Sequence, residues 1–320
     1  MIRPNTRRID GGKGGGMRKR TAAALSAVVA GVLFMTAISA AQVDDASRIM
    51  DQNKAGVLYL VSLGKDKEEV GRGTGFALGE NLIIANYHVV SQAFRVEAYT
   101  SDNKKIKVDG IVGVSKGSNI VLLQVRSKFQ NLIAGNFDIV TPDMKLFVIG
   151  ANEAGEITIV NGTARSVVQV TPEMRVADLA MSLPLTFSGA PVIDVSGQVV
   201  GILTVLDRGL KFVMPVNIFR NLSRLSKPVD FEAWTRENFF DTQEGSLIAG
   251  RIAAAINDTG NAQRLLERVV RAAPNNTEAQ TLLAKVYGEQ RDYSSAVNAY
   301  LKLLELDPNK AEAHFELGVI

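Results

Sequence analysis

A series of short apolar runs, separated by Gly, Asn, Asp and Ser, extends from Ala55 to about Asn217. Roughly a dozen such runs recur about every 8–15 residues, for example at 57–62, 82–85 and 199–205. Long helical stretches do not separate them, and alternation of apolar and polar residues is partial, which suits strands buried on both faces. The pattern therefore predicts an all-β barrel or sandwich.

After Pro228 the pattern changes to helical repeats. Residues 231–240 form a short aromatic and charged connector that contains the only tryptophan, and beyond it the segment 273–276 recurs as 307–310. This 34-residue period is that of tetratricopeptide (TPR) repeats, in which small residues let two antiparallel helices approach closely. Two units in register, with a third starting at Ala311, predict an α-helical TPR solenoid.

These patterns divide the chain into four parts. We expect an upstream extension and signal peptide over 1–41, a β domain over 42–222, a linker over 223–245 and TPR repeats over 246–320, the last one incomplete. An incomplete repeat leaves an apolar helix face without a polar cap. Either the gene product continues beyond Ile320, or the exposed end packs against another surface.

The amino terminus has the pattern of an export signal. Arg18, Lys19 and Arg20 form a basic segment after Met17, the expected start, and 21–41 is an uncharged run of small and apolar residues. Small residues at 39–41 satisfy the rule for signal cleavage, so we expect a periplasmic or extracellular protein of a bacterial envelope. The alternative is an uncleaved membrane anchor over 21–41, since about 20 apolar residues suffice to span a bilayer.

Composition excludes several classes of function. The formal net charge is +3, but seven cations precede residue 41, and residues 42–320 hold 29 Lys and Arg against 32 Asp and Glu. A nucleic-acid partner therefore lacks electrostatic support. The chain has no cysteine, no Gly-rich phosphate loop after a strand and no cluster of His and carboxylates at metal-ligand spacing. We therefore expect no cofactor and no metal.

Three residues indicate the chemistry of a serine hydrolase. His88 ends the apolar strand 82–90, Asn119 opens a strand and Ser188 precedes a Gly-punctuated apolar stretch. A lone histidine at a strand end is commonly structural, and the Ser-Gly-Ala-Pro segment at 188–191 is a plausible turn by itself. Their joint occurrence in this order, beside these strands, favours a histidine general base and a serine nucleophile.

The stretch from Gly71 to Asn217 resembles the HtrA-like branch of trypsin-like serine proteases, at the segments 73–76, 85–90, 113–125, 188–192, 197–202 and 212–215. The resemblance implies a multi-domain protein in which a trypsin-like double Greek-key β-barrel over 42–222 precedes the TPR solenoid. It assigns the general base to His88, the nucleophile to Ser188, the acid position to Asn119, and the oxyanion hole to Thr186 and Ser188. HtrA-like proteins often carry a PDZ domain at the place where this chain has repeats.

The chain departs from the family pattern at Asn119 and Thr186. An amide at the acid position can donate to the imidazole of His88 and so stabilise the wrong tautomer of the ring. In a related fold, replacing the acid by an amide lowers kcat about 10⁴-fold. The family places Gly at position 186, and a β-branched residue resists positive φ, so we expect a flipped peptide whose carbonyl faces the hole. Losing one oxyanion donor typically costs on the order of 10²–10³ in rate. Ala190, which also replaces a family glycine, is a milder change.

We therefore expect an exported protein of trypsin-like serine protease fold in which proteolysis is weakened or lost. The alternative is an active HtrA-like serine endopeptidase that acts on envelope proteins, which the retention of both His88 and Ser188 favours. Both functions imply a protein or peptide partner in the TPR groove and a protein substrate or ligand at the barrel cleft. Contact with a membrane is expected only if 21–41 is not cleaved.

Overall fold

The computed structural model describes residues 45–79, 81–234 and 237–320. The chain divides into two units, Met1–Ser47 and Arg48–Ile320, and all of the structure below belongs to the second unit. The expected start at Met17, the export signal and its cleavage site lie outside the described residues. Among the described residues, no helix combines the length and the apolar character needed to cross a membrane.

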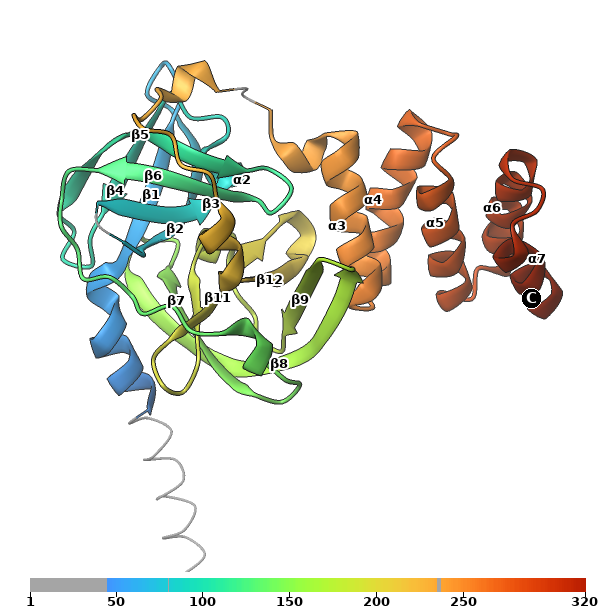
Figure 1. The fold of residues 1–320 in the computed structure, drawn as a ribbon, viewed down its shortest axis with the longest axis horizontal. Coiled ribbons are helices and arrows are strands. Elements are labelled where there is room, and N and C mark those ends of the chain that lie inside the picture. Colours follow the sequence, from blue (N-terminus) through green and yellow to red (C-terminus); the bar gives the residue numbers. More distant parts are fainter. Residues whose placement is uncertain (1–44, 80, 235–236) are drawn as a thin grey trace, which may run out of the picture. The chain divides into compact units, whose positions relative to one another are not determined.

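The first six strands close into a barrel in the order β1-β2-β3-β6-β5-β4 (Figure 1). They are β1 (Val57–Leu63), β2 (Glu69–Ala77), β3 (Leu82–Asn86), β4 (Arg95–Tyr99), β5 (Lys105–Ser115) and β6 (Ile120–Val125). All pairs are antiparallel, and β1 pairs with β4 to close the barrel. β3 and β6 are buried along nearly their whole length. The one-turn helix α2 (Tyr87–Val90) follows β3 directly.

The second barrel has the order β10-β11-β12-β9-β8-β7. Its strands are β7 (Lys145–Ala151), β8 (Ile157–Thr171), β9 (Met174–Leu179), β10 (Pro191–Ile193), β11 (Val199–Val205) and β12 (Lys211–Pro215). Its core is built from aliphatic side chains of all six strands together with Phe137 and Phe187. The two barrels confirm the fold class expected from the apolar runs and from the resemblance.

Helices follow the barrels: α3 (Gln243–Ala255), α4 (Thr259–Ala272), α5 (Thr277–Glu289), α6 (Tyr293–Leu306) and α7 (Ala311–Val319). Side-chain caps at their amino termini repeat with the expected period, since Thr242 and Asp258 recur as Asn276 and Asp292. Each cap accepts a hydrogen bond from a backbone N–H in the first turn, which the helix cannot satisfy itself. Consecutive helices pack as antiparallel pairs, and α3 also packs beside β8 (Figure 1).

Short 3₁₀ turns connect the barrels to the helices. Phe231–Ala233 and Phe239–Asp241 lie in the aromatic connector, and Phe231, Phe239 and Phe240 are all buried. Asn238 caps the second of these turns by accepting from the N–H of Phe240 at 3.2 Å. The connector is thus packed against the rest of the chain at these residues.

Candidate active site

His88, Asn119 and Ser188 come together where the two barrels meet. His88 lies in α2 at the end of β3, and Asn119 lies immediately before β6, the neighbour of β3 in the first barrel. Ser188 belongs to the second barrel, directly after the 3₁₀ turn Leu185–Phe187 and before β10. A backbone hydrogen bond of 2.8 Å from Thr74 N–H to the carbonyl of Ser188 joins the two barrels beside the site.

The three side chains form a line of hydrogen bonds. Ser188 Oγ lies 3.1 Å from His88 Nε2, and the opposite ring nitrogen, Nδ1, faces the amide of Asn119. Asn119 adopts φ of +57°, a left-handed conformation that Asn and Asp tolerate better than other side chains. The structure therefore brings the three candidate residues into the arrangement on which the chemistry of a serine hydrolase depends.

The amide of Asn119 has a defined orientation. Its Oδ1 accepts from the backbone N–H of His88 at 3.0 Å, so the oxygen must face that donor. Its Nδ2 then lies 2.8 Å from His88 Nδ1, closer than Oδ1 at 3.1 Å. Because an amide NH₂ can only donate, Nδ1 serves as the acceptor and the proton of the neutral imidazole resides on Nε2. That tautomer presents a donor, not a base, to Ser188.

The hydroxyl of Ser188 is satisfied by other groups. Its Oγ accepts from Val205 N–H at 3.0 Å, and Asn86 Oδ1 lies 2.9 Å away as an acceptor for the hydroxyl proton. The orientation of Asn86 is also defined, because its Nδ2 donates to the carbonyl of Asn119 at 3.1 Å and to Thr204 Oγ1 at 3.2 Å. Ser188 is 1% exposed. The carbonyl of Val205, at 3.1 Å, is a second acceptor, so the proton of Ser188 has two partners other than the histidine.

The oxyanion turn is closed by its own backbone. Thr186 lies inside the 3₁₀ turn and does not adopt a positive φ. The N–H of Ser188 donates to the carbonyl of Leu185 at 2.9 Å. The carbonyl of Thr186 is held by the hydroxyl of Thr74 at 2.8 Å. An oxyanion hole needs free N–H groups aimed at the reacting oxygen. Here the carbonyl of Leu185 already takes the donor of Ser188.

Gly189 explains why the turn can sit so close to the first barrel. Its φ is +90°, and an added Cβ would lie 2.1 Å from the carbonyl oxygen of Thr74. Only glycine meets both conditions, because it lacks a Cβ and adopts positive φ without strain.

Burial governs the protonation of His88. Removal from water lowers the pKa of its imidazole to about 4, while Asn119, whose Oδ1 lies 3.1 Å from Nδ1, and the negative charge of Asp207 act in the opposite direction. The imidazole is therefore neutral at pH 7 in this structure. A carboxylate at position 119 would oppose the effect of burial far more strongly than an amide does.

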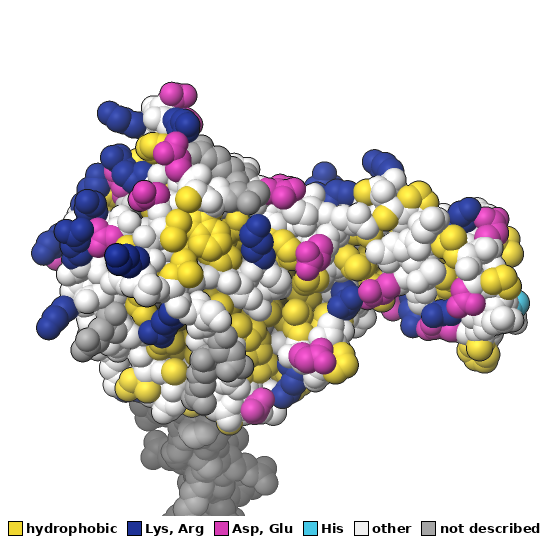
Figure 2. Space-filling view, turned by 45° about the horizontal axis from the view of Figure 1, so that its top comes forward, with side chains coloured by type: hydrophobic (Ala, Val, Ile, Leu, Met, Phe, Trp, Pro, Cys, Tyr) yellow, Lys and Arg dark blue, Asp and Glu magenta, His cyan; other side chains and the backbone are white. Residues whose placement is uncertain are grey.

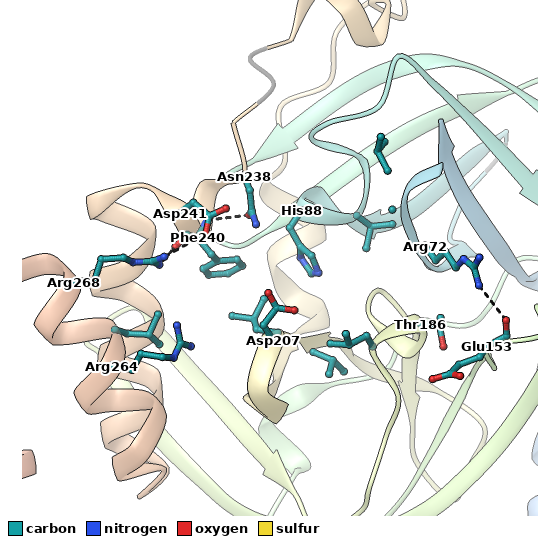
Figure 3. A pocket seen from close by; sticks show the side chains of 17 residues that line it. Arg72, His88, Glu153, Thr186, Asp207, Asn238, Phe240, Asp241, Arg264 and Arg268 are labelled. Carbon is teal, nitrogen blue, oxygen red and sulfur yellow. Dashed lines mark hydrogen bonds and ion pairs between the residues drawn. The ribbon is translucent and has the colours of Figure 1, made fainter. Parts of the chain in front are cut away.

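A pocket of about 520 Å³ opens beside His88 and is lined by barrel, connector and helix α4 (Figure 3). The ring of Phe240 packs against the imidazole of His88 with centroids 6.1 Å apart and planes at 65°. The carbonyl of Phe240 accepts from the guanidinium of Arg268 and from Ser246 Oγ, so α3 and α4 hold the connector in place. Part of the cleft beside the histidine is thus filled by the chain itself.

Several site residues were missed by the sequence analysis. Asn86 is a buried polar residue at the end of an apolar run and Thr204 is one inside such a run, and that anomaly was a usable signal. Asp207 has no comparable signal, because its proximity to His88 depends on how the barrels meet. Phe240 belongs to the aromatic connector, whose contact with His88 the local sequence does not predict.

Within the described part of the chain, no group of three or more His, Cys, Asp or Glu side chains is placed to hold a metal ion. The contacts among His88, Asn119 and Ser188 are hydrogen bonds between uncharged side chains, and charged side chains are among the residues that line the pocket.

Comparison with known families follows the same division of the chain. Residues 73–202 match the model described as a trypsin-like peptidase domain, and residues 285–320 match the model of a TPR repeat. The chain thus carries a trypsin-like peptidase domain followed by TPR repeats. Within that class it is similar to HtrA and Deg proteins, as the following relatives show.

Two curated relatives illustrate the similarity. The serine protease HTRA1 of Xenopus laevis is 26% identical over 159 residues, which cover 46% of this chain and 34% of that protein. The anti-sigma-I factor RsgI9 of Acetivibrio thermocellus is 30% identical over 148 residues, which cover 46% of this chain and 21% of that protein. The chain spans between about a fifth and a third of the length of these relatives.

Solved structures share the fold at low identity. Deg5 superposes with a TM-score of 0.50 and 16% identity over 56% of this chain and 92% of that chain. The active form of the Rv3671c protease from M. tuberculosis superposes with a TM-score of 0.51 and 20% identity over 59% of this chain and 89% of that chain. Both likenesses concern the double barrel.

Proposed function

We propose that this protein is an exported, protease-fold binding protein in which proteolysis is strongly weakened or lost. Its barrel cleft and its TPR repeats then serve to bind proteins or peptides. One observation carries the proposal: Oδ1 of Asn119 accepts from the backbone N–H of His88, so Nδ2, which lies 2.8 Å from Nδ1, is the amide group that faces the ring. This contact places the ring proton on Nε2, where a general base must be unprotonated.

Two further features support the loss of activity. The proton of Ser188 has Asn86 Oδ1 as an acceptor at 2.9 Å, so the hydroxyl does not depend on the histidine. The N–H of Ser188 is used by Leu185, so the developing negative charge of an acyl-transfer transition state would lack this donor. The nucleophile, the base and the oxyanion hole are therefore each held in a state that opposes catalysis.

One observation favours the second candidate, an active HtrA-like endopeptidase that acts on envelope proteins. Ser188 Oγ and His88 Nε2 lie 3.1 Å apart, within the reach that nucleophile and base require. A modest rearrangement of the Leu185–Phe187 turn on substrate binding would free the N–H of Ser188. The two candidates differ in whether Ser188 reacts in the native protein.

The proposed partners are proteins. TPR repeats are typical protein-interaction modules, and a protease-fold cleft accepts extended peptide. On the face drawn in Figure 2, acidic and basic side chains are interspersed on both the barrels and the repeats. This mixed surface agrees with the charge balance of residues 42–320, which gives no support for nucleic-acid binding. The export part of the proposal rests on the sequence pattern of residues 17–41.

The test is labelling of Ser188 by a fluorophosphonate probe. We expect no labelling of the native protein and clear labelling of the Asn119→Asp, Thr186→Gly double variant, which is abolished when Ser188→Ala is added. Asn103→Asp is the matched control, because Asn103 also has positive φ (60°) but is exposed, in the loop between β4 and β5. Native labelling that disappears in Ser188→Ala would establish the active endopeptidase instead. A repaired variant that stays inert would overturn the assignment of the site.

A further inference from the structure

The pocket beside His88 has two walls of different origin. One is formed by the barrels, with Thr186 and Asp207 among its residues, and the other by helix α4, which contributes Arg264, Leu265 and Arg268. In Figure 3, Arg264 and Thr186 lie on opposite sides of His88. A ligand that fills this pocket therefore contacts the protease fold and the first repeat together.

Donors without partners gather at this pocket. Across the part of the chain that the structure describes, six buried side-chain nitrogen or oxygen atoms have no hydrogen-bond partner. Three of the six belong to residues that line the pocket, namely Thr186 Oγ1, Arg264 Nε and Arg268 Nε. A buried polar atom without a partner costs free energy, so such atoms mark places where a bound polar group is expected.

The two arginines differ in how their remaining atoms are used. Arg268 donates to the carbonyl of Phe240 and forms an ion pair with Asp241 at 3.3 Å, so its charge is already matched. Arg264 donates from Nη2 to the amide oxygen of Asn261 at 3.2 Å, which is a neutral partner. Of the two guanidinium groups, that of Arg264 is therefore the one whose charge is available to a ligand.

The surroundings of Arg264 favour an anion. Burial and the positive charges of Arg208 and Arg268 lower the pKa of its guanidinium, and Asp207 and Asp258 compensate only in part. A negative group beside Arg264 would relieve the repulsion among these three arginines. Leu265, Phe240 and Leu206 give the same pocket apolar surface, and the carboxylates of Asp207 and Asp241 line it beside them. An acidic group next to an apolar one fits this combination.

We propose that the pocket between the barrels and α4 binds a peptide segment, and that a carboxylate of this peptide accepts hydrogen bonds from the guanidinium of Arg264. The inference rests on the proposed function, because it takes the barrel cleft as a peptide-binding site. Arg264 offers Nε and Nη donors in a planar fork, the geometry that matches both oxygens of a carboxylate. An apolar side chain of the same peptide packs against Leu265 and Phe240. The carboxylate comes from an Asp or Glu side chain or from the carboxyl terminus of the peptide.

The test is selection from a random dodecapeptide library, with one pool carrying free and one carrying amidated carboxyl termini. If Arg264 binds an Asp or Glu side chain of the peptide, the native protein should enrich peptides from both pools that carry Asp or Glu beside an apolar residue. Enrichment in the free pool alone indicates a terminal carboxylate. Enrichment of peptides without a carboxylate, or of none at all, overturns the proposal.

Affinity measurements on the enriched peptide identify the arginine. Fluorescence anisotropy measures the affinity for this peptide. We expect Arg264→Gln to weaken binding about 10-fold or more, because it removes a charged hydrogen bond. Replacing the acidic residue of the peptide by its amide should weaken binding of the native protein to the same extent. Arg264→Lys should retain part of the affinity. Arg271→Gln is the matched control, because Arg271 is exposed on the same helix and does not line the pocket. Equal binding by the native protein and Arg264→Gln would overturn the proposal.

The carboxylate site and the loss of proteolysis can fail independently of each other. A native protein that labels with fluorophosphonate yet still selects acidic peptides through Arg264 refutes the loss of proteolysis and leaves the carboxylate site standing. A native protein that does not label and that selects neutral peptides refutes the carboxylate site and leaves the loss of proteolysis standing. Thermal unfolding of Arg264→Gln and Arg264→Lys shows whether either variant is folded before its affinity is compared.

Discussion

The amide of Asn119 lies against the ring of His88, with Nδ2 2.8 Å and Oδ1 3.1 Å from Nδ1. In a working serine protease a carboxylate at this position accepts from Nδ1 and stabilises the imidazolium that forms during the reaction. The amide keeps the position of the acid and its contact with the ring, but reverses the direction of the hydrogen bond.

Asn119→Asp should raise the pKa of His88 from about 4 by one unit or more, because a carboxylate within hydrogen-bond distance favours the charged imidazole. Titration of the imidazole proton signals by NMR measures this shift, and only His314 contributes a second histidine. Asn103→Asp controls for an added charge elsewhere. A pKa that does not move would show that the side chain at 119 does not act on the ring.

Acidification should destabilise the fold through His88. An imidazole titrates near pH 6.5 in the unfolded chain, whereas burial lowers the pKa of His88 to about 4 in the fold. Between these pH values the unfolded state binds more protons, so stability rises with pH and is lost as pH falls from 6.5 towards 4. The loss should be on the order of 2–3 kcal/mol.

Denaturant unfolding at pH 7 and pH 4.5 measures this effect. His88→Gln removes the titrating group and keeps a side chain that hydrogen-bonds, so it should show a smaller loss between the two pH values. The same loss in both proteins would assign the acid sensitivity to other groups.

Thr186→Gly should accelerate labelling of Ser188 in an Asn119→Asp background by on the order of 10²-fold, because glycine lets the turn adopt the positive φ that frees the N–H of Ser188. In the present turn that N–H donates to Leu185 at 2.9 Å. The rate of fluorophosphonate labelling gives the comparison between single and double variants. No acceleration would show that Thr186 is not what keeps the turn closed.

Phe240→Ala should expose His88 to chemical modification. The two rings lie 6.1 Å apart, and Phe240 is 5% exposed. Carbethoxylation of His88 by diethyl pyrocarbonate, followed by mass spectrometry with His314 as internal reference, should increase several-fold. Phe315→Ala serves as the control because Phe315 is 69% exposed on α7. An unchanged rate would mean that the connector does not shield the histidine.

Gly189→Ala and Gly209→Ala separate a steric clash from backbone strain. Both glycines have positive φ, +90° and +79°, and so carry a similar backbone cost of about 1–2 kcal/mol on substitution. At Gly209 no described atom lies within 4 Å of the added methyl group, whereas at Gly189 it meets the carbonyl of Thr74 at 2.1 Å. Gly189→Ala should therefore lower the melting temperature considerably more, and equal effects would contradict the tight contact at the barrel junction.

The fold was largely predictable because its signals are local. Short apolar runs with Gly and Asn between them predicted strands, and the 34-residue recurrence of Pro and small residues predicted paired helices. Both patterns arise from the periodic burial of side chains, which acts over a few residues at a time. The choice between barrel and sandwich needed the resemblance to a known family, because strand order is not encoded in any single run.

Part of the candidate site was predictable in the same way. His88, Asn119 and Ser188 were identified from their positions at strand ends, and the chemical consequence of an amide at 119 follows from residue type alone. The roles of Asn86 and Val205 could not be anticipated, because they arise when two strands of different barrels bring their ends to the hydroxyl of Ser188.

The residue pattern alone is enough to predict the two repeating architectures and the amide in place of an acid in a line of three candidate residues. The folded chain was needed to find the acceptors for the proton of Ser188, the carbonyl that takes the N–H of the oxyanion turn, and the arginine of α4 whose charge is available in the pocket beside His88. These are contacts between segments more than 50 residues apart or between backbone atoms whose orientation depends on packing. Local sequence patterns carry no information about such contacts, because their energies exist only once the chain is folded.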